Sequence, residues 1–386
     1  MSEPAIPFTL AATNDELDDL KMRLCRTRWP DKEPVSDWSQ GVPLREAKRL
    51  VEYWRTSYDW RRCETKLNNA GQFKMNIDGL DIHFLHIRSP EPDALPLIMT
   101  HGWPGSVIEF LKVIGPLTDP VAHGGKAHDA FHLVLPSIPG FGFSEKPAAT
   151  GWGLDKIAGA WALLMRDLGY RRYVAQGGDF GAGITTVLAH MAPAGLAAIH
   201  LNLPIVVPRE PGPDLDTEQI AALVALAKFQ RWGAGYAEQQ ATRPQTLGYA
   251  LADSPVGQAM WIYEKYWAAA DHADDLESVV TLDEVLDVIT SYWLSNSATS
   301  SARLYWESFH DFFNERVITL PVGCSIFPGE FYQAPRRWAD MFYSNIIYWN
   351  HPPRGGHFAA LEQPDIFADE IRACFRSLRS HSTVAP

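Results

Sequence analysis

The sequence predicts an α/β fold in which a mostly parallel sheet of eight strands carries helices on both faces. From residue 95 onward, short apolar runs alternate with helical stretches, which is typical of parallel sheets covered on both sides. A glycine-rich turn at residues 176–183 joins one apolar run directly to a helix. Between residues 205 and 316 the alternation stops. We therefore expect a helical unit inserted into the α/β core.

The first element in chain order is an extension over residues 1–90. Two helices are expected there, the first capped by Thr13 or Asn14 and the second starting near Pro43. A hairpin should follow, formed by Phe73–Ile77 and Asp81–Ile87 around an Asp-Gly turn.

The core is expected over residues 91–204 and 317–386, with residues 205–316 forming a cap between its two parts. Its strands should be the short apolar runs at residues 96–99, 132–135, 173–175, 197–201, 322–327 and 346–349. Its helices should lie at residues 106–114, 154–168, 183–190 and 361–378.

The composition is that of a globular protein with a sizeable core, at 46% hydrophobic and 21% charged residues over 386 positions. A net charge of −12 argues against nucleic acid or an anionic membrane as partner. The four cysteines show no CxxC spacing, so neither zinc nor a disulfide framework is expected. The start of the chain has no basic, uninterrupted signal sequence, and no apolar run could span a bilayer. We expect a cytoplasmic protein and leave a homodimer open.

The glycine-rich turn has the pattern Gly-x-nucleophile-x-Gly, with Asp179 at its centre and Phe180 after it. In the α/β-hydrolase fold this pattern forms a nucleophile elbow, a sharp strand-to-helix turn that raises one side chain above the sheet. A carboxylate in that place suits attack on an sp3 carbon, such as that of an epoxide or alkyl halide. The sequence therefore predicts an enzyme that opens a small electrophile.

An elbow of this kind works with an oxyanion hole. One donor should be the backbone N–H of Phe180, and the other should come from the loop after an earlier strand. The segment His101–Ser106 follows the strand at residues 96–99, and Trp103 is the expected donor. The Trp103–Pro104 bond is a candidate for the cis form because this loop must turn tightly.

The general base should follow the last strand of the sheet. His357 lies there, directly before the last helix, and Glu330 ends the preceding strand 27 residues earlier, where it can orient the imidazole. His351 and Asp340 are the alternatives for base and acid. No metal is expected, since no Cys-x-x-Cys spacing supports one. No cofactor is expected either, since the turn at the elbow lacks the Gly-x-Gly-x-x-Gly pattern of nucleotide sites.

Four motifs together resemble the microsomal-type epoxide hydrolases: His101–Ser106, Gly177–Gly181, Phe327–Glu330 and Arg354–Ala360. The likeness covers nearly the whole chain. It implies an α/β-hydrolase core with a helical cap, and it makes the first 90 residues similar to the N-terminal wrapping domain of that family. The membrane anchor of the animal enzymes has no counterpart here, so the resemblance implies a soluble form.

Two tyrosines enter only through the resemblance. Tyr236 and Tyr305 match the cap tyrosines that hydrogen-bond the epoxide oxygen in that family. Two departures concern the substrate pocket, which should include Trp103, Pro104, Phe180 and Ala237. The family usually has Trp where this chain has Phe180, and the animal enzymes have a larger side chain where it has Ala237.

The predicted reaction is the hydrolysis of an epoxide to a vicinal diol. Asp179 would form an ester with the substrate, and water activated by His357 and Glu330 would hydrolyse it. A dehalogenase with the same residues is one alternative, although halide would need N–H donors such as an indole, which Phe180 does not supply. A catalytically silent binding protein is the other. The sequence leaves the identity of the epoxide open.

Overall fold

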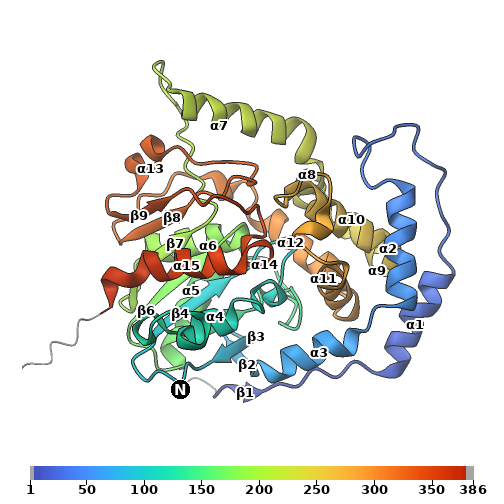
Figure 1. Cartoon of the computed structure of the whole chain (residues 1–386), viewed down its shortest axis with the longest axis horizontal. Helices are drawn as coiled ribbons and strands as arrows, with labels where there is room; N and C mark the ends of the chain where they lie inside the picture. Colours follow the sequence, from blue (N-terminus) through green and yellow to red (C-terminus); the bar gives the residue numbers. More distant parts are fainter. Residues whose placement is uncertain (1–3, 380–386) are drawn as a thin grey trace, which may run out of the picture.

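The computed structural model describes residues 4–379, which form a central twisted sheet with helices on both faces and a helical region beside it (Figure 1). The strand order is β1-β2-β3-β5-β4-β6-β7-β8-β9. The strands are β1 (Ile6–Pro7), β2 (Gln72–Ile77), β3 (Leu80–Ile87), β4 (Leu95–Thr100), β5 (Phe131–Pro136), β6 (Tyr173–Gly177), β7 (Leu196–Leu201), β8 (Val322–Ser325) and β9 (Ile346–Asn350).

The sheet is antiparallel at one side and parallel elsewhere. Pairing is antiparallel from β1 through β2 and β3 to β5, and parallel from β5 through β4 to β9. The predicted fold class is confirmed, and a strand forms at every predicted run, although β8 ends at Ser325 rather than at residue 327. The sheet has nine strands rather than eight, because the two-residue β1 pairs with the edge of the hairpin.

The helices lie in three groups. In the N-terminal extension they are α1 (Asn14–Cys25), α2 (Leu44–Thr56) and α3 (Trp60–Asn69). In the core they are α4 (Ile114–Thr118), α5 (Leu154–Asp167), α6 (Phe180–Met191), α13 (Arg336–Phe342), α14 (Ala359–Glu362) and α15 (Pro364–Phe375). Between β7 and β8 they are α7 (Thr217–Lys228), α8 (Gly235–Thr242), α9 (Pro244–Asp253), α10 (Pro255–Ala269), α11 (Leu282–Leu294) and α12 (Ala298–Ser308).

Two helices differ from the prediction. The stretch at residues 106–114 is mostly a 3-10 turn, Val107–Phe110, because tertiary packing buries three of its four residues and sets its path. The helix expected at residues 361–378 is divided into α14 and α15. Pro364 opens α15, and the residue before a proline avoids helical geometry, as Gln363 does with φ −135° and ψ 63°.

The first helix begins where the sequence predicts. The Thr13 hydroxyl accepts from the Glu16 backbone N–H, and the Glu16 carboxylate accepts from the Thr13 N–H, which is a capping box. The third helix of the extension, α3, was not predicted. Its N-terminus is capped by Asp59, whose side chain accepts from the Arg61 N–H.

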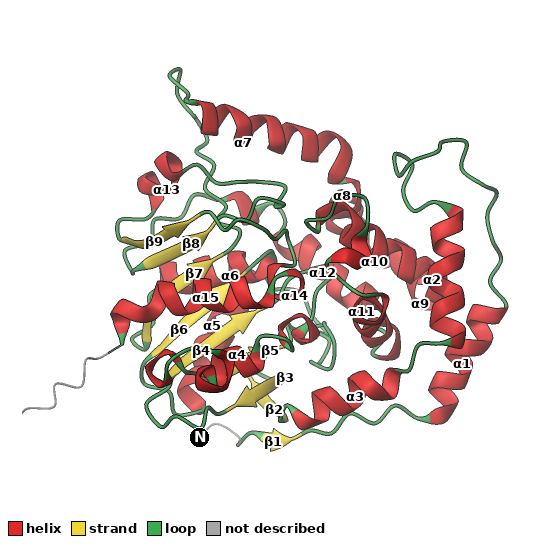
Figure 2. Cartoon of the chain, viewed as in Figure 1, coloured by secondary structure: helices red, strands yellow, loops and turns green. Residues whose placement is uncertain are grey.

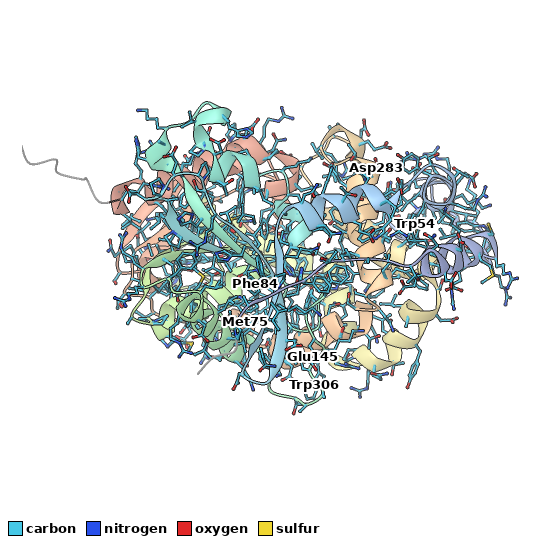
Figure 3. The ribbon with its side chains drawn as sticks, turned by 90° about the horizontal axis from the view of Figure 1, so that it is seen from below. Trp54, Met75, Phe84, Glu145, Asp283 and Trp306 are labelled. Carbon is cyan, nitrogen blue, oxygen red and sulfur yellow. The ribbon has the colours of Figure 1, made fainter. Side chains whose placement is uncertain are left out.

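The extension packs against the helices between β7 and β8, on the side away from the sheet (Figures 1 and 2). The buried Trp54 indole donates to Thr290 over 3.0 Å, and Tyr53 donates to Asp283 over 2.9 Å. Trp54 and Asp283 mark this junction in Figure 3, and Met75 and Phe84 mark the hairpin beside it. The extension therefore holds α11 from outside.

The region at residues 205–316, where the alternation of strands and helices stops, is helical, as the sequence predicts. It lies over the carboxyl ends of the parallel strands, where open α/β sheets bind ligands (Figure 2). The division of the chain into four regions at residues 90, 204 and 316 stays a prediction. Among residues 4–379, no helix combines the length and apolar character needed to cross a bilayer.

Candidate active site

Asp179 sits on a strained strand-to-helix turn between β6 and α6. Its φ of 49° and ψ of −130° are costly for a residue with a side chain. The turn is possible because Gly181 leaves room for the neighbouring strand: a Cβ there would collide with the Thr100 carbonyl oxygen. The crowding of this backbone fixes where the Asp179 carboxylate points.

The loop after β4 contacts this carboxylate directly. The Trp103 backbone N–H donates to Asp179 Oδ1 over 2.8 Å, and a side chain on Gly102 would collide with the same carboxylate. The Trp103–Pro104 bond is cis, as predicted. The Trp103 N–H thus points at the Asp179 carboxylate from the loop after β4, and Phe180 is the first residue of α6.

The buried His101 holds this loop in shape. Its Nδ1 lies 2.9 Å from the Gly102 carbonyl oxygen, and its Nε2 lies 3.2 Å from the Ile138 backbone N–H. Burial lowers the pKa of His101 to about 4, so the ring is neutral at pH 7. It then donates to Gly102 through Nδ1 and accepts from Ile138 through Nε2.

His357 and Glu330 meet beside Asp179. His357 Nε2 lies 3.4 Å from Asp179 Oδ2, and His357 Nδ1 lies 3.0 Å from each Glu330 oxygen. All three side chains are largely buried, with 10% of His357, 17% of Asp179 and 2% of Glu330 exposed. One imidazole therefore bridges two carboxylates in a site that is largely shielded from solvent.

The two carboxylates decide the protonation of His357. Burial alone lowers the pKa of the imidazole, but the charges of Glu330 and Asp179 outweigh burial and raise that pKa well above its ordinary value. The ring is therefore an imidazolium at neutral pH while both carboxylates are charged. Neutralising either carboxylate would make the ring easier to deprotonate.

The loop that carries His357 is fastened to the end of α10. The Glu362 carboxylate accepts from the backbone N–H groups of Gly356 and Phe358 over 3.0 and 2.8 Å, and from Asp271 over 2.7 Å. The His357 N–H donates to the Ala269 carbonyl over 2.9 Å. Sequence reasoning missed Glu362 because its partners are backbone groups, which leave no pattern in the sequence.

Tyr236 and Tyr305 join an aromatic cluster with Trp103 and Phe180. The Tyr236 ring stacks on Trp103 at 5.1 Å between centroids, and the Tyr305 ring meets Phe180 edge-on at 4.7 Å. Burial, followed by the Asp179 charge for Tyr236 and by the charges of Tyr236 and Asp179 for Tyr305, raises the pKa of both phenols. Both remain protonated at neutral pH and can donate hydrogen bonds.

The other predicted residues fall as follows. Pro104 and Ala237 are buried, Pro104 beside Trp103 and Ala237 one residue after Tyr236. His351 is exposed and accepts from the Trp349 indole over 3.2 Å, and Asp340 pairs with Arg336 on the surface. Neither alternative contacts Asp179 or His357.

A cavity of about 1300 Å³, open to solvent, lies between the extension and the helices α8 to α10. Among its walls are the aromatic side chains of Trp29, Trp232, Trp261 and Tyr236. Of the five side chains predicted to take part in catalysis, only Tyr236 lines it. Tyr236 is therefore the catalytic candidate that this cavity shares with the site around Asp179.

A strained strand-to-helix turn that raises Asp179, with Glu330 and His357 in the loops after β8 and β9, is the arrangement of the α/β-hydrolase fold. Residues 96–257 match the family description "alpha/beta hydrolase fold", and residues 5–110 match "Epoxide hydrolase N terminus". The chain belongs to the epoxide hydrolases, in the microsomal-type family that its motifs resemble.

Relatives match over nearly the whole chain. A protein of Stigmatella aurantiaca, provisionally named an epoxide hydrolase, is 59% identical to this chain. The match covers 97% of this chain and 85% of the Stigmatella protein. Epoxide hydrolase 1 of Sus scrofa is 35% identical over 95% and 87%. The Aspergillus niger epoxide hydrolase structure has a TM-score of 0.86, with 31% identity over 97% of both chains. The juvenile hormone epoxide hydrolase of Bombyx mori has a TM-score of 0.87, with 28% identity over 98% and 96%.

Proposed function

We propose that this chain converts a small epoxide to a vicinal diol through a covalent ester on Asp179. The observation that carries the proposal is the arrangement around that carboxylate: Trp103 N–H holds Oδ1, and Oδ2 lies beside His357. A carboxylate is ionised at neutral pH without a base, so it can attack directly.

Ring opening is the first step. Asp179 Oδ2 forms a bond to one epoxide carbon, and the bond from that carbon to the ring oxygen breaks. The oxygen leaves as an alkoxide, which takes a proton from Tyr236 or Tyr305. Tyr305 is buried and Tyr236 is partly buried, and both phenols are protonated at neutral pH, so either can supply that proton.

The ester then changes the protonation of His357. Once Asp179 is an ester it is neutral, and one of the two charges that raise the His357 pKa is gone. The imidazolium can now lose its proton, which restores the tyrosine. Alkylation of the nucleophile thus produces the neutral base that the second step requires.

Hydrolysis completes the cycle. His357 Nε2 takes a proton from water, and hydroxide adds to Cγ of Asp179. The resulting oxyanion lies at the Trp103 and Phe180 N–H groups, and one such donor is typically worth about 3 kcal/mol of barrier. The bond to the diol oxygen breaks, the diol takes the proton from His357, and the new carboxyl group returns its proton to the ring.

A single turnover in H₂¹⁸O with enzyme in excess tests the proposal. The hydrolytic oxygen should enter Asp179, so the peptide that contains it gains mass and the first diol stays unlabelled. Styrene oxide is a suitable probe, because Trp103, Phe180 and the two cap tyrosines form an aromatic cluster at the site. Label in the first diol and none in the peptide would show direct attack by water.

A further inference from the structure

A second, much smaller cavity lies between Asp179 and His357, on the side of the loop after β4. Its volume is about 20 Å³, and a water molecule needs roughly 10–15 Å³ of such space. Besides those two residues, its walls include Gly105, Glu109, Gln176 and Asn202. It is therefore large enough for one water beside the reacting carboxylate.

Two residues of the cavity wall, Gln176 and Glu109, have oxygen atoms that make no hydrogen bond to Asp179 or His357. Gln176 is 1% exposed, and its amide Nε2 donates to Asn202 Oδ1 over 2.8 Å. Gln176 Oε1 has no hydrogen-bond partner among the described residues. A buried carbonyl oxygen without a partner is costly, and a water bound in a polar cavity is the usual remedy.

Glu109 supplies the other oxygen. It is partly buried, and its carboxyl folds back so closely over Gly105 that a side chain on that glycine would collide with it. Burial raises the pKa of Glu109 to about 8, against the lowering effect of the His357 charge. A carboxyl at this place accepts a hydrogen bond through its carbonyl oxygen even when it is protonated.

We propose that this cavity holds the hydrolytic water, and that Glu109 and Gln176 position it for attack on the Asp179 ester. This inference rests on the proposed function, since it assigns residues to the second step. While His357 is an imidazolium its Nε2–H faces Asp179 Oδ2, so both hydrogens of the water need other acceptors, which Glu109 and Gln176 Oε1 provide.

After alkylation the neutral His357 Nε2 takes over one of those hydrogens. Glu109 keeps the other, so the water presents a lone pair to Cγ of Asp179. The new bond joins the water oxygen to Cγ, and the proton moves to His357 Nε2. The protonation of Glu109 does not change in this step, so Glu109 acts as a positioning residue.

Single-turnover measurements on Glu109→Ala and Glu109→Gln test the proposal. Ester formation is followed by mass spectrometry of acid-quenched protein, and its decay gives the hydrolysis rate with styrene oxide as probe. Glu109→Ala should slow hydrolysis by about 10- to 100-fold, the usual effect of losing a hydrogen bond to a reacting group, and leave alkylation within about twofold. Glu109→Gln keeps an acceptor oxygen and should lose only a few-fold.

The control is Asp287→Asn, another buried carboxyl whose pKa burial raises, to about 6, but which lies in α11 outside the cavity. It should change neither rate. Thermal unfolding of each variant shows whether it is folded, and Glu109→Gln remains informative if Glu109→Ala is not.

Hydrolysis at the wild-type rate in both Glu109 variants would overturn the inference and leave the proposed function intact. Slower alkylation with normal hydrolysis would overturn it too, because it would place Glu109 in ring opening. The absence of any ester in the wild-type enzyme would remove the proposed function and the inference together.

Discussion

Asp179 and His357, the proposed nucleophile and base, are held in place by different means. Asp179 is fixed by local backbone: a strand end, a strained turn and glycines that let neighbouring strands approach. His357 is fixed from a distance, because Glu362 and the end of α10 bind its loop. The comparison shows that one half of the site depends on a short motif and the other on the cap being in position.

The largest expected effect comes from the elbow. Asp179→Asn removes the nucleophile and should reduce diol formation by at least about 10⁴-fold, since loss of a nucleophile removes the covalent route. Acid-quenched protein should show no ester. A variant that still turned over at a comparable rate would mean that water attacks the epoxide directly.

The second-largest effect is expected for His357, the proposed base. His357→Gln should reduce steady-state turnover by about 10³-fold, because no group then takes the proton from water. Alkylation does not need the base, so a stoichiometric ester should accumulate and persist. If the ester failed to form, His357 would be required for the first step, and the two halves of the site would not be separable.

Removal of the Glu330 charge, which lies next to His357, should reduce turnover by a smaller factor. Glu330→Gln should slow hydrolysis by about 10- to 100-fold, because the imidazole loses its orienting acceptor. The lost charge also lowers the His357 pKa. Hydrolysis needs the neutral ring and rises with pH through that pKa, so its acidic limb should move to lower pH.

A pH–rate profile of the hydrolysis step, measured in single turnovers, checks this shift. A limb that stayed in place or moved to higher pH would contradict the role of Glu330. Asp340→Asn is a suitable control, because that carboxylate pairs with Arg336 on the surface and should leave the profile unchanged.

The smallest effect should come from weakening the hydrogen bonds that hold the loop of His357. Glu362→Gln leaves one amide oxygen for three backbone donors, so the loop around His357 should loosen. We expect ester hydrolysis to slow by about 3- to 10-fold, as for the loss of one or two hydrogen bonds, with alkylation unchanged. Amide hydrogen exchange should rise at residues 355–358, whereas equal loosening at the elbow would contradict the distinction between the two halves.

Patterns of local sequence predicted much of the molecule. Alternating apolar runs located the strands of the sheet, and the capping box at Thr13 located the first helix. The prediction failed where distant packing set the path. The turn at Val107–Phe110 is one case, and the two-residue β1, which exists only through its pairing with β2, is another.

The candidate site divides in the same way. Asp179, Trp103, His357 and Glu330 could be named from motif and position, since each lies in the loop or turn that follows a strand of the sheet. Glu109, Gln176 and Glu362 could not, because what distinguishes them is a shared cavity or a set of backbone donors. The roles proposed for all of these residues stay predictions.

Local sequence patterns were enough to predict the fold class and the turn that raises Asp179, because short-range patterns of glycine, apolar and charged residues restrict the backbone locally. Tertiary structure alone decided that His357 lies between two carboxylates, that a water-sized cavity lies beside it and that α10 holds its loop. These features depend on contacts between residues far apart in the chain, and such contacts exist only once the sheet and the cap have packed.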